Sequence, residues 1–140
     1  MAETSQLSAW IALFLGLYWL AAGVGELRGP NGWWMMLKEF ERSPALRFVT
    51  GFVTLAFGAA IYLVNPWRPN ESGGSDWLAI AVSVIGGIHV AQGLLILASG
   101  ERFLHAARAV IGRSGRVWGG LAATAGIAAT VVAMMRLHAF

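Results

Sequence analysis

Four long apolar runs limit what this chain can fold into. A helix of roughly 20 residues crosses the hydrocarbon core of a bilayer, which is about 30 Å thick. A soluble core helix would carry a polar stripe, and these runs carry none. The sequence therefore predicts an all-α membrane protein, a four-transmembrane-helix bundle in one domain, residues 1–140. The predicted spans are Leu7–Leu27, Ala45–Asn65, Trp77–Ser99 and Val117–Met135.

Composition supports this class and excludes several others. The chain is 57% hydrophobic and 12% charged, whereas ordinary globular domains are roughly 45–50% apolar and about 25% charged. The formal net charge is +3. The positive residues lie beside the apolar runs and form no dense patch, so we expect no nucleic-acid partner. The chain contains no cysteine, which excludes disulfides, thiolate catalysis and cysteine-ligated metal sites.

Lysine and arginine are unevenly distributed between the connections. The first and third connections carry four each, whereas the second connection and the C-terminal tail carry one each. By the positive-inside rule, the two basic connections face the cytoplasm and both termini face away from it. The start of the chain has no lysine or arginine, so we expect the first span to be retained and not cleaved as a signal peptide. Tryptophans are expected at the outer interface (Trp10, Trp67, Trp77) and at the inner one (Trp33, Trp34, Trp118).

Each basic connection contains a short amphipathic segment. Around residues 33–42 and 103–111, apolar side chains recur at helical spacing and charged ones occupy the rest of the surface. This pattern is typical of helices that lie in the headgroup plane, so we expect one on the cytoplasmic side of each hairpin. The neighbouring basic residues are candidate contacts for anionic lipid headgroups: Lys38, Arg42, Arg47, Arg108, Arg113 and Arg116.

The two halves of the chain have a similar layout. Two glycines seven residues apart lie in the first span of each half, and an arginine precedes a glycine by four residues in the second span. We therefore predict two parallel repeats, at about residues 7–65 and 77–135, related by an axis along the membrane normal. The matching positions are Gly16 and Gly23 with Gly86 and Gly93, and Arg47 and Gly51 with Arg116 and Gly120.

The first repeat combines a glycine-containing span, a Pro/Gly turn, Trp and Met on a short charged helix, and the entry Ser-Pro-x-Leu-Arg-x₃-Gly at residues 43–51. In these features Gly16 to Gly58 resembles the short, single-hairpin bacterial inner-membrane proteins classified as a domain of unknown function. The second repeat lacks the proline and the tryptophan pair. The resemblance implies a multi-pass protein of the bacterial inner (cytoplasmic) membrane, which would place both termini in the periplasm. It implies no activity.

His89 is the strongest candidate for a functional side chain, because it lies near the middle of the third span. Ionisable groups inside a membrane are rare and often functional. Gln92 follows it by three residues, and Tyr18 lies at a matching depth in the first span and is the expected partner. Two interpretations are open. His89 either makes a structural hydrogen bond between helices, or it binds a proton, a quinone or another ligand.

Two further features bear on function. Glu26 lies at the end of the first span and is expected to be a solvated boundary charge near Arg28. No acidic residue lies in the middle third of any span, which argues against proton-coupled antiport. Small residues form one face of the fourth span, where helix backbones can approach closely, either within the chain or against a second copy. They are Gly119, Ala122, Ala123, Gly126, Ala129 and Thr130.

These features favour a non-catalytic membrane protein, an oligomerising or accessory subunit that stabilises a membrane complex. One alternative is a small-solute channel or transporter that uses the repeat interface, with His89, Gln92 and Tyr18 along the path. Another is a quinone- or lipid-handling enzyme subunit built around His89. The sequence has no phosphate-binding loop, nucleophile motif or metal-ligand spacing. We therefore expect no catalytic residue, metal or cofactor, and we expect the lipid bilayer as partner, with a second copy or a larger complex left open.

Overall fold

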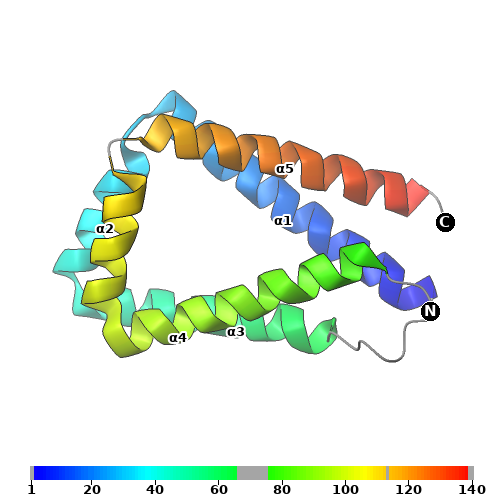
Figure 1. Ribbon diagram of the computed structural model, residues 1–140, viewed down its shortest axis with the longest axis horizontal. Helices are drawn as coiled ribbons and strands as arrows, with labels where there is room; N and C mark the ends of the chain where they lie inside the picture. The colour runs from blue at the N-terminus through cyan, green and yellow to red at the C-terminus, as the bar shows by residue number, and fades with distance from the viewer. Residues whose placement is uncertain (1, 66–75, 113, 139–140) are drawn as a thin grey trace.

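The computed structural model describes residues 2–65, 76–112 and 114–138, which form five helices (Figure 1). Four of these helices are long and apolar enough to cross a membrane, so the prediction of a multi-pass membrane protein with four spans is confirmed. Arg113 and the segment 66–75, with Trp67, lie outside the described residues. The helices are α1 (Ala2–Arg28), α2 (Gly32–Arg42), α3 (Pro44–Val64), α4 (Trp77–Ile111) and α5 (Gly115–His138).

The four long helices form two pairs, α1 with α5 and α3 with α4 (Figure 1). The pairs meet where α1 begins and α5 ends, and they diverge toward the opposite end of the molecule. There α2 and the last part of α4 cross between the diverging pairs and give the molecule a triangular outline. We call α2 together with residues 100–111 the collar, and the opposite end the terminal end.

Local turn chemistry sets the boundaries of α2. After α1 ends, Asn31 adopts a left-handed backbone conformation with φ 81°, which asparagine tolerates better than most residues. Ser43 is extended and ends α2, and its hydroxyl accepts a hydrogen bond from the backbone N–H of Leu46. Pro44 occupies the first turn of α3, where its missing N–H costs nothing. The span predicted at Ala45–Asn65 is thus observed as a helix that begins one residue earlier, at Pro44.

A break inside α4 produces the second part of the collar. Ser99 has non-helical backbone angles, φ −145° and ψ 43°, and the helix changes direction there. The third span was predicted to end near this residue, and the amphipathic segment beyond it is helical and follows the break as the second part of α4. Gly112, with φ 47°, ends α4 before the chain enters α5.

The apolar core lies at the terminal end, where the two pairs meet. Its buried members come from all four long helices: Ala9, Ala12 and Leu15 from α1, Ile61 from α3, Leu78 and Val82 from α4, and Ala133 from α5. Within the collar, Leu37 of α2 and Leu104 of α4 are buried. Most other large apolar side chains on the spans are exposed, as expected for surfaces that face lipid.

Candidate functional site

Glycines hold α1 against α5 at backbone contact. A Cβ atom on Gly16 would lie 2.9 Å from the carbonyl oxygen of Gly126, and one on Gly23 would lie 2.5 Å from the backbone nitrogen of Ala123. No side chain fits at either position, and such close approach is how small residues stabilise helix pairs in membranes. Gly119, Ala123 and Gly126 are buried in this contact, while Ala122, Ala129 and Thr130 are half-buried. The small-residue face of α5 therefore packs within the chain.

The α3–α4 pair repeats the same arrangement. A Cβ atom on Gly93 would lie 2.8 Å from the carbonyl oxygen of Gly51, and one on Gly58 would lie 2.8 Å from that of Gly86. In α5, Gly119 approaches Gly23 in the way that Gly51 approaches Gly93, whereas a Cβ atom on Gly120 would meet nothing within 4 Å. Gly119 is therefore the packing counterpart of Gly51, whereas the match of Gly51 with Gly120 by their spacing from a preceding arginine stays a prediction.

His89 lies at the α3–α4 contact. Its Nδ1 atom is 2.8 Å from the carbonyl oxygen of Ile85, one turn earlier in α4, and its ring meets the ring of Phe57 edge-on with centroids 6.1 Å apart. Its Cβ atom borders Gly58. The hydrogen bond stays within α4, and the ring contact joins α4 to α3.

The structure does not bring the predicted partners of His89 together. Tyr18 is 66% exposed on α1, whereas His89 contacts α3. Gln92 is half-buried on α4. The expected pairing of Tyr18 with His89 is therefore wrong: the two residues lie at similar depth in their spans, but they belong to different helix pairs and face different neighbours.

Glu26 is the residue that the sequence analysis misjudged most. It is 2% exposed, not solvated, and lies where α1, α2 and α5 meet. Its carboxylate accepts two hydrogen bonds of 2.8 Å, Oε1 from the backbone N–H of Asn31 and Oε2 from that of Trp33. These N–H groups belong to the start of α2, so an α1 side chain caps that helix and complements its dipole.

Glycines make room for the Glu26 carboxylate. A Cβ atom on Gly119 would lie 3.1 Å from Cβ of Glu26, and one on Gly115 would collide with Oε1. A Cβ atom on Gly32 would lie 3.1 Å from Oε2. The signal available in the sequence was an acidic residue five positions before an Asn-Gly helix start, a spacing that lets the carboxylate reach back to unpaired N–H groups.

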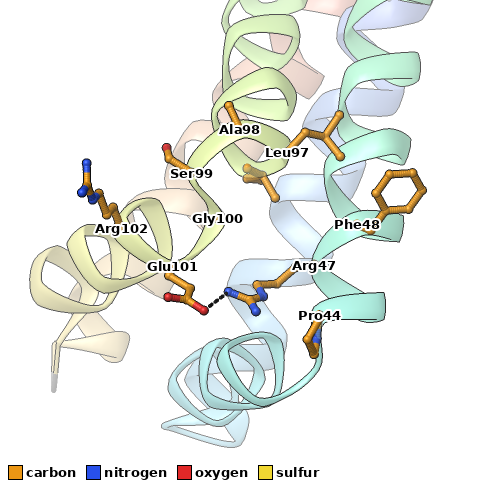
Figure 2. Close-up of a pocket in the computed structure, with 10 residues that line it drawn as sticks. Pro44, Arg47, Phe48, Leu97, Ala98, Ser99, Gly100, Glu101 and Arg102 are labelled. Carbon is orange, nitrogen blue, oxygen red and sulfur yellow. Dashed lines mark ion pairs between the residues drawn. The ribbon is translucent and has the colours of Figure 1, made fainter.

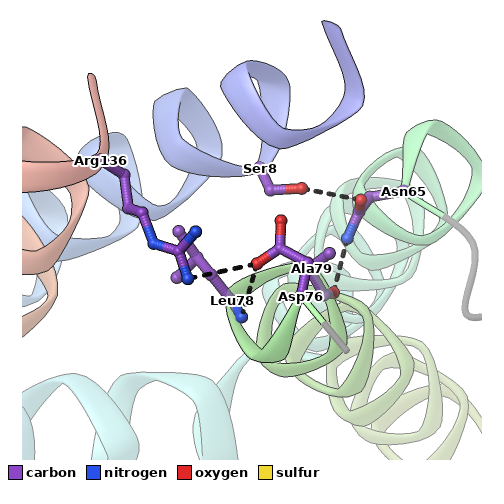
Figure 3. A network of polar contacts seen from close by, with 6 residues as sticks. All are labelled: Ser8, Asn65, Asp76, Leu78, Ala79 and Arg136. Atoms are coloured by element: carbon purple, nitrogen blue, oxygen red, sulfur yellow. Dashed lines mark hydrogen bonds and ion pairs between the residues drawn. The ribbon is translucent and has the colours of Figure 1, made fainter. Parts of the chain in front are cut away.

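A polar network joins the two helix pairs at the terminal end (Figure 3). The hydroxyl of Ser8 in α1 donates to the side-chain oxygen of Asn65 at the end of α3, at 2.9 Å. The Asn65 amide nitrogen donates to the carbonyl oxygen of Ala79 in α4, at 2.7 Å, and the Ser83 hydroxyl donates to the backbone oxygen of Asn65. Asn65 thus connects three helices.

Asp76 and Arg136 extend this network to α5. The Asp76 carboxylate caps α4 by accepting the N–H of Leu78 and lies 3.6 Å from the Arg136 guanidinium (Figure 3). The same guanidinium lies 5.7 Å from the ring centre of Trp77, within range of a cation–π contact. Every long helix therefore contributes to the connection at this end.

We expect Asn65→Leu to weaken the terminal end. The substitution removes two side-chain hydrogen bonds and leaves the buried Ser8 hydroxyl without the Asn65 oxygen, so the free energy of unfolding should fall by about 2 kcal/mol. Thermal unfolding in detergent micelles measures the change. The control is Thr124→Val, because the exposed Thr124 hydroxyl donates its hydrogen bond to Gly120 within the same helix. Equal losses for Asn65→Leu and Thr124→Val would contradict the prediction.

The collar is joined by an ion pair and a tryptophan. Arg108 of α4 pairs with Glu41 of α2, and its guanidinium lies 5.0 Å from the ring centre of Trp34. Lys38 lies 5.4 Å from the same ring centre. Two of the predicted headgroup contacts, Lys38 and Arg108, are therefore engaged in contacts within the protein. Arg42 and Arg116 are exposed.

Arg47 lines a pocket where α3 begins and α4 breaks (Figure 2). The pocket has a volume of about 480 Å³ and is bordered by α3 and by residues 96–102 of α4. Arg47 pairs with Glu101 across it at 3.2 Å. Gly100 follows the break, and a Cβ atom there would lie 3.5 Å from Cδ of Arg47.

These contacts use the polar groups for assembly and capping. Among the residues that the structure describes, no three His, Asp or Glu side chains come close enough to hold a metal ion. Comparison of the chain with known protein families, curated proteins and solved structures finds no match. The structure describes an integral membrane protein with four candidate spans.

Proposed function

We propose that the chain is a non-catalytic integral membrane protein, an accessory subunit that oligomerises or stabilises a larger membrane assembly. The observation that carries this proposal is that α3 packs less against the rest of the chain than the other three spans do, which leaves more of its surface for a partner helix. This helix is the least buried of the four spans, and away from its glycine contact with α4 it presents a row of large apolar side chains. They include Phe48, Val49, Phe52, Val53 and Leu63.

The contacts of the ionisable groups support the same proposal. Glu26 caps α2, Arg108 pairs with Glu41, and Arg136 pairs with Asp76. Each of these contacts connects helices, and none leaves a carboxylate and a base facing a common cavity, as general acid–base catalysis requires. The polar side chains named here stabilise the packing of the helices, as expected for a structural subunit.

The positions of His89 and Tyr18 do not favour the two alternatives, a transporter and an enzyme subunit. A transport path through His89, Gln92 and Tyr18 needs these side chains to face one passage, but Tyr18 lies on the exposed surface of α1 and His89 lies against α3. An enzyme site around His89 needs an open imidazole nitrogen beside a ligand pocket. The pocket described above is bordered by Pro44, Arg47, Phe48 and residues 96–102, and His89 does not line it.

We also propose that the chain consists of two repeats, residues 7–65 and 77–135, with the collar on the cytoplasmic side of a bacterial inner membrane. The equivalent glycine contacts support the repeats, since the first span of each half packs against the second span of the other. The basic residues of the two collar-side connections support the orientation.

Photo-crosslinking from α3 tests the proposed role. A benzophenone amino acid at Phe52, which is 58% exposed, should give a discrete protein crosslink in native membranes. A band at twice the chain mass indicates self-association, and any other band identifies a different subunit by mass spectrometry. The matched control is the same probe at Phe14 on α1, where we expect lipid. A probe at Phe52 that captures no protein while the fold is intact would contradict the proposal.

A further inference from the structure

The pocket at the α4 break combines two kinds of surface (Figure 2). One part is apolar and is formed by Phe48, Ile96, Leu97 and Ala98. The other part is polar and carries Arg47, Ser99 and Arg102. The pocket lies where α3 enters its span and where α4 leaves its own to form the collar. Apolar and cationic groups therefore meet at the level where a bilayer changes from acyl chains to headgroups.

Arg47 is the central cation of this pocket. Its side chain is only 15% exposed, and its guanidinium points toward Glu101 in Figure 2. The Glu101 side chain is 83% exposed, so it can turn into water with little loss of free energy, as is usual for exposed ion pairs. The pair thus consists of a fixed cation and a displaceable anion.

We propose that this pocket binds the phosphate group of an anionic phospholipid. The lipid phosphate then takes the place of Glu101 as the partner of the Arg47 guanidinium. The planar guanidinium donates two parallel hydrogen bonds to phosphate oxygens, a geometry that lysine lacks. The second part of α4 begins at Gly100, so the positive end of its dipole adds to the attraction. One acyl chain lies along Phe48 and Leu97.

Charge and position favour a lipid over a free anion. Arg47 and Arg102 against Glu101 leave one net positive charge at the pocket. In Figure 2 Arg102 points away from the Arg47–Glu101 pair and provides the second cation at the rim. A free phosphate would use only the cationic part, whereas a phospholipid also covers the apolar part formed by Phe48 and Leu97.

Arg47 differs from the other basic residues near the collar. Arg108 is engaged by Glu41 and Trp34. Arg42 is 77% exposed on α2, and its ion pair with Glu39 is long, at 4.0 Å. Arg42 therefore provides a matched control, because it carries the same charge near the same surface but does not line the pocket.

Native mass spectrometry of the full chain, released from detergent micelles, tests the proposal. Phosphatidylglycerol and phosphatidylcholine with identical acyl chains are titrated separately. We expect Arg47→Gln to weaken phosphatidylglycerol binding about tenfold, since it removes a charge-assisted contact. Glu101→Gln should strengthen binding about threefold to fivefold, because it removes the competing anion. Arg42→Gln should change phosphatidylglycerol binding little. The parent protein should bind phosphatidylcholine more weakly than phosphatidylglycerol, because the choline cation of phosphatidylcholine offsets its phosphate charge beside Arg47 and Arg102.

Three results would overturn the proposal. Equal losses for Arg47→Gln and Arg42→Gln would mean diffuse attraction to the basic surface. Displacement of the lipid by millimolar inorganic phosphate would mean a free-anion site. Unchanged binding in both Arg47→Gln and Glu101→Gln would mean that the pocket is not used. If Arg47→Gln lowers the unfolding temperature, two other variants decide. Glu101→Gln should leave the fold intact because the Glu101 side chain is exposed. Arg47→Lys should bind more strongly than Arg47→Gln but more weakly than the parent protein.

Discussion

Replacing Gly23 with leucine should separate α1 from α5 and lower the free energy of unfolding by about 3 kcal/mol. A Cβ atom at this position would lie 2.5 Å from the backbone nitrogen of Ala123 and 2.9 Å from its Cα. These are backbone atoms, which cannot rotate away as the end of a flexible side chain can. The helices must therefore move apart, and the close contacts at Gly16 and Gly126 are lost with those at Gly23.

Gly25→Leu is the matched control for this prediction. Gly25 lies two residues further along the same helix, and a Cβ atom there would meet nothing within 4 Å. Its substitution should change stability by no more than about 0.5 kcal/mol. Reversible unfolding in mixed detergent and dodecyl sulfate micelles, followed by circular dichroism, measures both variants. Similar losses at Gly23 and Gly25 would show that the effect comes from the hydrophobic side chain and not from helix contact.

The spans and their boundaries were predictable because local properties determine them. Apolar length predicts a crossing, and Ser43-Pro44 predicts a helix start whatever lies nearby. The break of α4 at Ser99 was also close to the predicted end of its span. The amphipathic pattern of residues 33–42 predicted α2 for the same reason: a helix periodicity is visible in the sequence itself.

Helix pairing was not predictable, because it depends on which faces meet. The seven-residue glycine spacing was interpreted as a sign of two repeats. In the structure these glycines lie on the contact faces of α1 and α4, but the spacing did not indicate the partner helices. Adjacent glycines add ambiguity, since neighbouring residues point about 100° apart around a helix of 3.6 residues per turn. Gly120 was matched with Gly51 by its spacing from Arg116, and this spacing does not show which of two neighbouring glycines faces the partner helix.

The same limit explains the error at Tyr18. Position within a span determines the depth of a side chain, so His89 and Tyr18 were expected at one level. Direction around the helix is set by packing, and the glycine face of α1 turns Tyr18 outward, where it is 66% exposed. Depth alone does not predict contact between two side chains in a bundle.

Glu26 was misjudged because burial of a charge depends on unpaired groups elsewhere in the fold. From the sequence, an acidic residue beside Arg28 at the end of a span reads as solvated. In the structure the start of α2 presents the N–H groups of Asn31 and Trp33 to this carboxylate, and glycines of α5 leave space for it. The resulting contacts make Glu26 the connection between α1, α2 and α5.

Replacing Glu26 with alanine should lower the free energy of unfolding by about 3 kcal/mol, because it leaves two part-buried N–H groups without an acceptor and removes a side chain that is only 2% exposed. Glu26→Gln should cost about half as much: the amide keeps one acceptor oxygen but turns an N–H₂ donor toward the other N–H. The matched control is Glu39→Gln, since Glu39 is exposed on α2 and only weakly paired with Arg42. It should have almost no effect.

Hydrogen exchange locates the effect of Glu26. The amides of Asn31 and Trp33 should exchange faster in Glu26→Gln than in the parent protein, and faster still in Glu26→Ala, because the start of α2 loses its cap. The amides of α3 should keep the exchange rates of the parent protein, since α3 begins with its own cap at Ser43. Unchanged exchange at residues 31–33 in Glu26→Ala would mean that the carboxylate does not hold α2 in place, and the position of α2 would then depend on its other contacts, chiefly those with α3 and α4.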